Sequence, residues 1–202
     1  AASYGFEGSY ARTRFALSVA VIAEEGGGVL QRDGWFTQAP VPGRLEDPAS
    51  VGREAARRCL RRLGWRKVET RQVPVVFSPE VAASFAGVIA RACCGDALFR
   101  RASFLAGSLG LEVASPAFSL VDDPTIPGGR GSRSFDAEGA RPIRKAIFEK
   151  GVLRNFLFDS YSLRRLAEAS PDRAAGGTPG NAVRGLSGPT GVGCSNLFVE
   201  AG

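Results

Sequence analysis

Two stretches in which strand-like residues flank glycine constrain the fold of this chain more than any other feature. In residues 14–23, apolar side chains at every second position alternate with small or polar ones, which predicts a strand with one apolar face. Glycines at 26–28 allow the chain to reverse, and residues 29–39 return with a second set of apolar side chains. The pattern predicts an antiparallel hairpin over residues 14–38.

The second stretch, residues 143–158, consists of two short apolar-rich runs, Ile143–Glu149 and Val152–Phe158. The runs meet at Lys150 and Gly151, and Gly151 is expected to adopt the positive φ that a tight turn requires. A second hairpin is therefore predicted here.

Three helices are predicted, over residues 48–63, 79–93 and 160–167. Asp47 and Pro48 form a start signal for the first helix. Its apolar face is expected to comprise residues at positions i, i+3, i+4 and i+7: Ala56, Cys59, Leu60 and Leu63. The second helix is apolar nearly all round and is therefore expected to be buried.

Further strands are predicted in residues 67–77, 111–123 and 196–202. Strands and helices do not alternate regularly along the chain, which argues against a doubly wound parallel sheet. The expected fold class is α+β, with a mainly antiparallel, curled or barrel-like β-sheet and a few flanking helices. The whole chain, residues 1–202, is expected to form a single domain.

Composition excludes several kinds of protein. Hydrophobic residues make up 44% of the chain and charged residues 23%, which is typical of a folded globular protein. No apolar run reaches the roughly 18 residues of a membrane span and no signal peptide opens the chain, so a cytoplasmic location without a membrane partner is expected. Because histidine is absent, the chain cannot supply a Ser-His-Asp triad or a histidine-based zinc site from its own residues. Methionine is absent too, which predicts a processed or partial chain.

An excess of arginine leaves nucleic-acid binding open as an alternative. The net charge of +6 rests on 26 Lys and Arg against 20 Asp and Glu. The helix predicted over residues 48–63 carries arginines opposite its apolar stripe: Arg53, Arg57, Arg58, Arg61 and Arg62. A solvated face is favoured over a phosphate-binding one, since no aromatic side chains for base stacking are interleaved with these arginines.

The four cysteines are predicted to be small buried hydrophobes. Cys93 and Cys94 are adjacent, while Cys59 and Cys194 stand alone in the sequence. This arrangement does not resemble the disulfide framework of a secreted domain.

The two candidate functional sites are a glycine-rich loop and an acidic turn. The loop over residues 176–193 holds seven glycines but no lysine, which excludes a P-loop. As a long loop it is a candidate for lining a substrate site, with these residues singled out: Gly176, Gly177, Gly180 and Arg184. In the turn, Asp136 and Glu138 precede Gly139, and paired carboxylates of this kind perform acid–base chemistry or bind a hard cation. A structural turn is the favoured alternative.

Several motifs together resemble one known family. They are SRSFDAEG at 132–139, EKGVLRNFLFDSYSLRRL at 149–166, TPGNAVRG at 178–185 and CSNLFVEAG at 194–202. In this order and spacing they resemble the TldD/PmbA family, also called TldD/TldE. The N-terminal residues, from RFALSVAVIAEEGGG onward, resemble the PmbA (TldE) branch, so the likeness covers nearly the whole chain.

The resemblance implies a role in proteolysis. Members of the family form a heterodimeric metallopeptidase in which the TldD-type subunit carries a His-Glu-x-x-x-His zinc motif and the TldE-type subunit does not. The expected partners are thus a TldD-type zinc subunit, or a second copy in a homodimer, together with an unfolded peptide substrate. This chain would correspond to the C-terminal domain of a PmbA-type protein, without the family's N-terminal domain.

The same resemblance suggests where the zinc motif would fall, which is close to Ala86–Arg91. Arginine has no lone pair to offer a metal, so no cofactor is expected in this chain and zinc is expected only in the partner. The matching motif residues are expected to be structural or to contact a subunit: Phe135, Asp136, Glu138, Gly139, Gly151, Asn181 and Asn196. The alternatives are a nucleic-acid or DNA-gyrase-interacting module and a self-sufficient peptidase, for which no recognisable device is present.

Overall fold

The structure, a computed structural model, describes residues 4–169 and 178–200. Its contacts divide the chain into two compact units. The hairpin unit is Ala11–Val75, and the sheet unit combines Ala1–Tyr10 with Val76–Gly202. The single domain expected from the sequence stays a prediction. Each is described by itself below.

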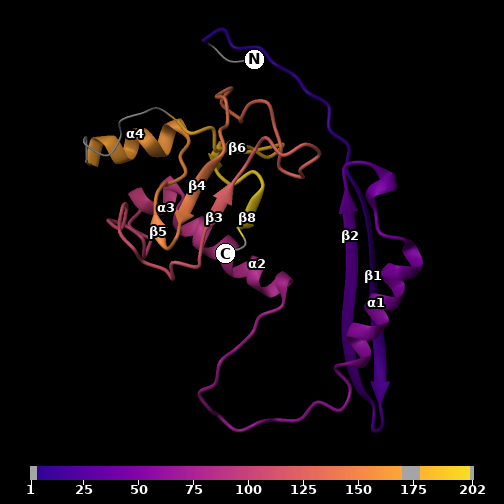
Figure 1. The fold of residues 1–202 in the computed structure, drawn as a ribbon. Helices are drawn as coiled ribbons and strands as arrows, with labels where there is room; N and C mark the ends of the chain where they lie inside the picture. Colours follow the sequence, from indigo (N-terminus) through magenta and orange to yellow (C-terminus); the bar gives the residue numbers. More distant parts are fainter. Residues whose placement is uncertain (1–3, 170–177, 201–202) are drawn as a thin grey trace. The chain divides into compact units, whose positions relative to one another are not determined.

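In the hairpin unit, strands β1 (Phe15–Glu25) and β2 (Val29–Ala39) pair antiparallel in continuous register, which confirms the first predicted hairpin. The short 3-10 helix η1 (Pro42–Arg44) leads to α1 (Pro48–Leu60), which lies alongside the hairpin in Figure 1. The Asp47 carboxylate accepts a hydrogen bond from the Ser50 N–H at 3.0 Å and so caps α1 as expected.

The buried face of α1 differs from the predicted one. Val51, Ala55 and Cys59 are fully buried, whereas Leu60 is 58% exposed. These three residues follow an i, i+4, i+8 row that the strands of the hairpin cover. The Cys59 Sγ lies 3.3 Å from the Gln31 carbonyl oxygen. Of the adjacent predicted residues Cys59 and Leu60, only Cys59 therefore faces the strands.

The strand predicted over residues 67–77 is absent. No strand forms there, and its valines are exposed, Val76 at 97%. The prediction rested on β-propensity, but a strand needs a hydrogen-bonding partner, and Pro74 removes one donor from the segment. The next helix, α2 (Pro79–Ala92), forms where predicted, yet only part of its surface is buried. Ala86 and Ala90 face the core while other apolar side chains are exposed: Val81, Phe85 and Val88.

The sheet unit is built on four antiparallel strands in the order β5-β4-β3-β8. Their bounds are Leu120–Asp122 for β3, Lys145–Glu149 for β4, Val152–Leu153 for β5 and Leu197–Val199 for β8. The hairpin predicted over 143–158 is therefore confirmed as β4–β5. Within the described residues, the strands expected over 111–123 and 196–202 are shorter than predicted, and residues 201 and 202 lie outside that part of the chain.

Helices α3 (Gly95–Phe99) and α4 (Ser160–Ala169) complete the sheet unit (Figure 1). The glycine-rich loop contains a small hairpin of β6 (Ala182–Val183) and β7 (Gly191–Val192). The core joins α2 and the sheet through a set of buried side chains that includes Leu120, Ile147, Phe148, Leu153 and Leu157. The predicted α+β class with antiparallel sheets is confirmed, and no helix within the described residues could span a membrane.

The β4–β5 turn has the predicted backbone conformation. Lys150 has φ 46° and Gly151 has φ 80°, so both turn residues lie in the left-handed region. A side chain at position 151 would also collide with the carbonyl oxygen of Ala114.

We expect Gly151→Ala to lower the free energy of unfolding by about 1–3 kcal/mol, because it adds φ strain and a backbone collision. Urea denaturation followed by hydrogen exchange of β4 would measure the change. Gly52→Ala is the matched control, since Gly52 lies in α1 with open space around it and alanine should stabilise that helix slightly. Equal effects of the two substitutions would contradict the assigned role of the turn.

Candidate functional site

In the acidic turn, the Asp136 side chain holds the backbone in place through hydrogen bonds. Asp136 is 3% exposed, and its Oδ1 accepts hydrogen bonds from the N–H groups of Glu138 and Ala140, each at 2.9 Å. Its Oδ2 accepts the N–H of Ala182 at 3.0 Å, which ties the turn to β6. Gly139 completes the turn with φ 78°. Both carboxylate oxygens therefore act as acceptors for main-chain donors.

Glu138 serves a different element. Its carboxylate accepts the N–H of Ser160 at 2.9 Å as well as the Ser160 hydroxyl, at the N-terminus of α4. A carboxylate is favourable at that end of a helix because the free N–H groups there carry partial positive charge. Asp159 caps the same helix by accepting the Ser162 N–H at 2.8 Å. Asp136 and Glu138 thus bind separate partners, as structural acceptors do.

A second polar cluster lies in the core and was not predicted. It joins Asp122 on β3, Lys145 on β4 and Asn181 beside β6, all of them buried. The Lys145 ammonium donates to Asn181 Oδ1 and to the Pro179 carbonyl, each at 2.9 Å, and lies 3.9 Å from Asp122 Oδ2. The Asn181 amide donates to the same Asp122 oxygen at 2.9 Å.

Ser195 satisfies the remaining oxygen of Asp122. Its N–H and its hydroxyl both donate to Asp122 Oδ1 at 2.6 Å. Burial lowers the pKa of Lys145, and the Asp122 carboxylate opposes that shift. A serine and a buried lysine are both present, but the serine hydroxyl is bonded to the aspartate and the ammonium to carbonyl oxygens. The cluster has the hydrogen bonding of a structural ion pair.

Asn196 holds the turn-rich segment before the acidic turn. Its Oδ1 accepts the N–H of Gly131 at 2.7 Å. Its Nδ2 donates to the Asp123 carbonyl at 2.6 Å and to the Ser132 hydroxyl oxygen at 2.9 Å. Asn196 thus fixes both ends of the segment between β3 and the acidic turn.

The glycine-rich loop is only partly described. Gly176 and Gly177 lie outside the described residues. Gly180 has φ 73° and packs against the backbone of Pro142, while the Arg184 Nε donates to the Gly188 carbonyl at 3.2 Å. A role of these residues in lining a substrate site stays a prediction.

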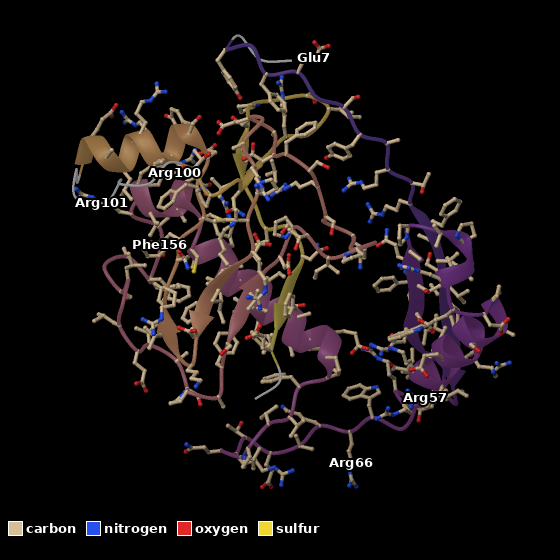
Figure 2. All side chains as sticks on the ribbon, turned by 45° about the horizontal axis from the view of Figure 1, so that its top comes forward. Glu7, Arg57, Arg66, Arg100, Arg101 and Phe156 are labelled. Atoms are coloured by element: carbon tan, nitrogen blue, oxygen red, sulfur yellow. The ribbon has the colours of Figure 1, made fainter. Side chains whose placement is uncertain are left out.

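A hollow of about 540 Å³ lies near the start of this loop, between α3, α4 and the chain after β5. Thr178 and Pro179 form part of its wall. Most of the remaining lining is apolar and includes Leu98, Leu109, Ile143, Phe156, Leu163 and Leu166. The side chain of Phe156 is labelled in Figure 2.

Several arginines on α1 and directly after it form ion pairs with neighbouring carboxylates. Arg57, labelled in Figure 2, donates from Nε to Glu54 at 2.8 Å. Arg58 and Arg62 both reach Asp33 on β2, at 3.4 Å and 3.3 Å. These pairs match the solvated-face interpretation of the helix.

The helix α2 carries the segment where the resemblance places the zinc motif. Ala86 is buried in the core, and the Arg91 guanidinium forms a two-point ion pair with Asp96, one contact of which is 2.8 Å. The hydrogen bonds that the Arg91 guanidinium donates to the Asp96 carboxylate raise the pKa of Arg91. Within the described residues, no group of three or more His, Cys, Asp or Glu side chains is placed to hold a metal ion.

The cysteines behave as the sequence predicted. Cys59, Cys93 and Cys94 are buried and Cys194 is partly buried, all with free thiols. Burial raises the pKa of Cys93 and of Cys194 to about 12. Such thiols are neutral at physiological pH and make poor nucleophiles and metal ligands.

We therefore expect these thiols to react slowly with thiol-modifying reagents in the native protein. We also expect them to make the free energy of unfolding depend on pH. The folded pKa of about 12 for Cys93 and Cys194 lies above the usual value of 9.0 that applies after unfolding. The stabilising contribution is thus fully present below pH 9 and is lost as pH rises from about 9 to 12. Urea denaturation across this range, with Cys194→Ala as comparison, would show a steeper loss for the unsubstituted chain, and equal slopes would contradict the assignment.

Comparison with known proteins agrees with the fold and the motifs. Residues 1–63 match the model of the PmbA/TldA metallopeptidase central domain, and residues 70–202 match that of the C-terminal domain. The chain is 37% identical over 174 residues to the metalloprotease PmbA of Escherichia coli O157:H7, covering 86% of this chain and 38% of that protein. It therefore spans about two fifths of the length of that relative.

Solved structures give the same result. A crystal structure from Bacteroides thetaiotaomicron, provisionally described as a modulator of DNA gyrase, matches with a TM-score of 0.85 and 28% identity, over 99% of this chain and 41% of that one. TldE from Thermococcus kodakarensis shares the fold, with a TM-score of 0.78 at 22% identity, over 94% of this chain and 41% of that one. On the family models and the sequence identity together, this chain belongs to the PmbA/TldD family of metallopeptidases.

Proposed function

We propose that this chain is part of a non-catalytic, PmbA/TldE-type subunit, which helps to enclose unfolded peptides for cleavage by a zinc-bearing TldD-type partner. The observation that carries the proposal is the ion pair between Arg91 on α2 and Asp96 on α3, because the resemblance places a zinc ligand at position 91. A zinc ion requires imidazole, thiolate or carboxylate donors. Here the position offers a guanidinium whose donors already face a carboxylate.

The neighbouring thiols support the same proposal. Cys93 and Cys94 directly follow α2, and burial raises the pKa of both. A metal would have to displace their protons against that shift, which makes them unsuitable substitutes for the missing histidines. Zinc is thus assigned to the partner rather than to this chain.

The exposed side of α2 suits a subunit that is covered by another protein. Val81, Phe85 and Val88 are exposed on it, at 46%, 50% and 61%. Clustered apolar side chains of this kind mark interaction surfaces more often than free surface. A heterodimer with a TldD-type subunit is the proposed assembly, and a homodimer is the alternative.

The test compares this protein alone with its mixture with the zinc-motif subunit from the same genome. Metal content by mass spectrometry and hydrolysis of an unfolded peptide would be measured for each protein and for the mixture. We expect stoichiometric zinc only in the partner, and hydrolysis in the mixture that exceeds the partner alone by at least about tenfold, a change of about 1.4 kcal/mol in transition-state stabilisation.

The matched control is a mixture made with a partner whose motif histidines are replaced. It should be inactive, because the chemistry is assigned to the partner's metal. Bound zinc with peptide turnover in this chain alone would refute the proposal and would point to a site built from residues other than histidine.

A further inference from the structure

The segment 4–10 packs against the acidic turn through aromatic rings. Phe6 and Tyr10 both contact Phe135 edge-on, with ring centroids 5.0 Å and 5.2 Å apart and interplanar angles of 69° and 75°. Aromatic pairs favour this edge-to-face geometry because the ring edge is positive and the face negative. Phe135, at the start of the turn, is therefore held between two rings from a distant part of the sequence.

Two glycines allow this close approach. A Cβ at Gly8 would lie 2.8 Å from the Phe135 ring and 2.9 Å from the Phe6 ring. A Cβ at Gly139 would lie 2.6 Å from the Phe6 ring. Contacts this short do not occur for real side chains, so glycine at both positions is a requirement of the docked arrangement. Gly8 has no positive φ that would otherwise call for glycine.

Among the described residues, 4–10 form no hydrogen bond or ion pair with the rest of the sheet unit. Most of its residues are exposed, and the Glu7 side chain points away from the chain in Figure 2. The ring contacts must offset the entropy of ordering the segment without help from hydrogen bonds, so its release costs less free energy than the release of a hydrogen-bonded segment.

Hydrogen bonds that do not involve the segment hold the surface beneath it in place. Asp136 anchors the turn by three main-chain hydrogen bonds, and Glu138 anchors it to α4. A hollow of about 660 Å³ is lined by Tyr4 and Phe6 of the segment together with Ala140, Ser160 and Thr178. A rigid surface binds a flexible segment at lower entropic cost than a mobile one.

We propose that the surface around Phe135 and Gly139 is a docking site for an extended aromatic–glycine segment, which the chain's own residues 4–10 occupy in an exchangeable way. The site recognises a segment with two aromatic residues and a glycine between them, in the order Phe6, Gly8, Tyr10. This assigns the acidic turn a binding role on its outer side, in addition to the structural hydrogen bonds on its inner side.

The test empties the site and refills it with a peptide. Gly8→Val should eject the segment, because the valine side chain would collide with Phe135, and Ser9→Val is the matched control, since Ser9 is exposed in the same segment. A synthetic peptide with the sequence of residues 3–12 would be titrated at millimolar concentrations, with the backbone amides of 137–140 followed by NMR.

The peptide should bind Gly8→Val roughly tenfold more tightly than the unsubstituted chain or Ser9→Val, in which the tethered segment competes at a high effective concentration. Binding should be lost when Phe135→Ala is added to Gly8→Val, or when alanine replaces both aromatic residues of the peptide. Thermal denaturation would verify that each variant is folded. Equal affinity for all three proteins, or binding that survives Phe135→Ala, would overturn the proposal.

Discussion

Replacing Asp122 by alanine is expected to lower the free energy of unfolding of the sheet unit by about 3–5 kcal/mol, because it leaves the buried Lys145 ammonium without its counter-charge. The same change removes one of the two acceptors of the Asn181 amide and the acceptor of two Ser195 donors. Each buried donor that is left unpaired adds its own desolvation cost. Hydrogen exchange of β4 under increasing urea would measure the loss in the sheet unit alone.

Two control variants make this prediction specific. Glu200→Ala breaks an exposed ion pair with Arg144, whose two residues flank β8 and β4, and should cost no more than about 1 kcal/mol. The double variant Asp122→Ala/Lys145→Met removes both charges, so it should be more stable than Asp122→Ala alone. If the double variant were the less stable one, the Lys145 ammonium would have to be held by its carbonyl contacts and not by the aspartate.

The sequence predicted those parts of the fold that depend on neighbours in the chain. The two hairpins follow from alternation and from glycine at the turns, and the start of α1 follows from Asp47. The prediction of a strand over residues 67–77 was wrong. It rested on the β-propensity of that segment alone, whereas a strand forms only when a second segment pairs with it. The burial of α2 was overestimated for a related reason, since an apolar surface does not specify what covers it.

The core cluster could not be predicted from spacing. Asp122, Lys145 and Asn181 come from β3, β4 and the glycine-rich loop, and only the tertiary fold brings them together. A charged residue inside an apolar run was the one available signal, because Lys145 and Asp122 both lie within predicted strands. The motif of the acidic turn is visible in the sequence, but its hydrogen bonds to Ala182 and Ser160 involve residues 46 and 22 positions away.

The two polar groups act on the same loop. Lys145 holds Pro179 and Asn181 at its start, and Asp122 holds Ser195 at its end. Asp136 fixes Ala182 between them. Three buried charged residues therefore hold the described part of a glycine-rich segment whose Ala182 and Val192 are also buried. A loop stabilised in this way has a defined surface, which is the condition under which it could line a peptide site.

Asp136→Ala is expected to lower the free energy of unfolding of the sheet unit by about 2–5 kcal/mol, since three main-chain N–H groups lose a charged acceptor at a buried position. Asp136→Asn keeps one acceptor oxygen for part of these N–H groups, so it should lower the free energy of unfolding by less than Asp136→Ala does. Hydrogen exchange should rise first at Glu138, Ala140 and Ala182, whose amides are bonded to the carboxylate.

The same variant separates a structural role of the acidic turn from a catalytic one. If Asp136 only organises backbone, then in the mixture with a TldD-type partner the peptidase activity per folded molecule should stay within about twofold of the unsubstituted protein. Asp136→Asn, which retains most of the fold, is the sharper version of the test because it removes the charge while keeping the shape. A folded Asp136→Asn protein that lost activity by orders of magnitude would mean that the carboxylate takes part in the chemistry. The carboxylate would then have to release its three backbone N–H donors when substrate binds. Faster hydrogen exchange at the Ala182 amide in the presence of peptide would reveal that release.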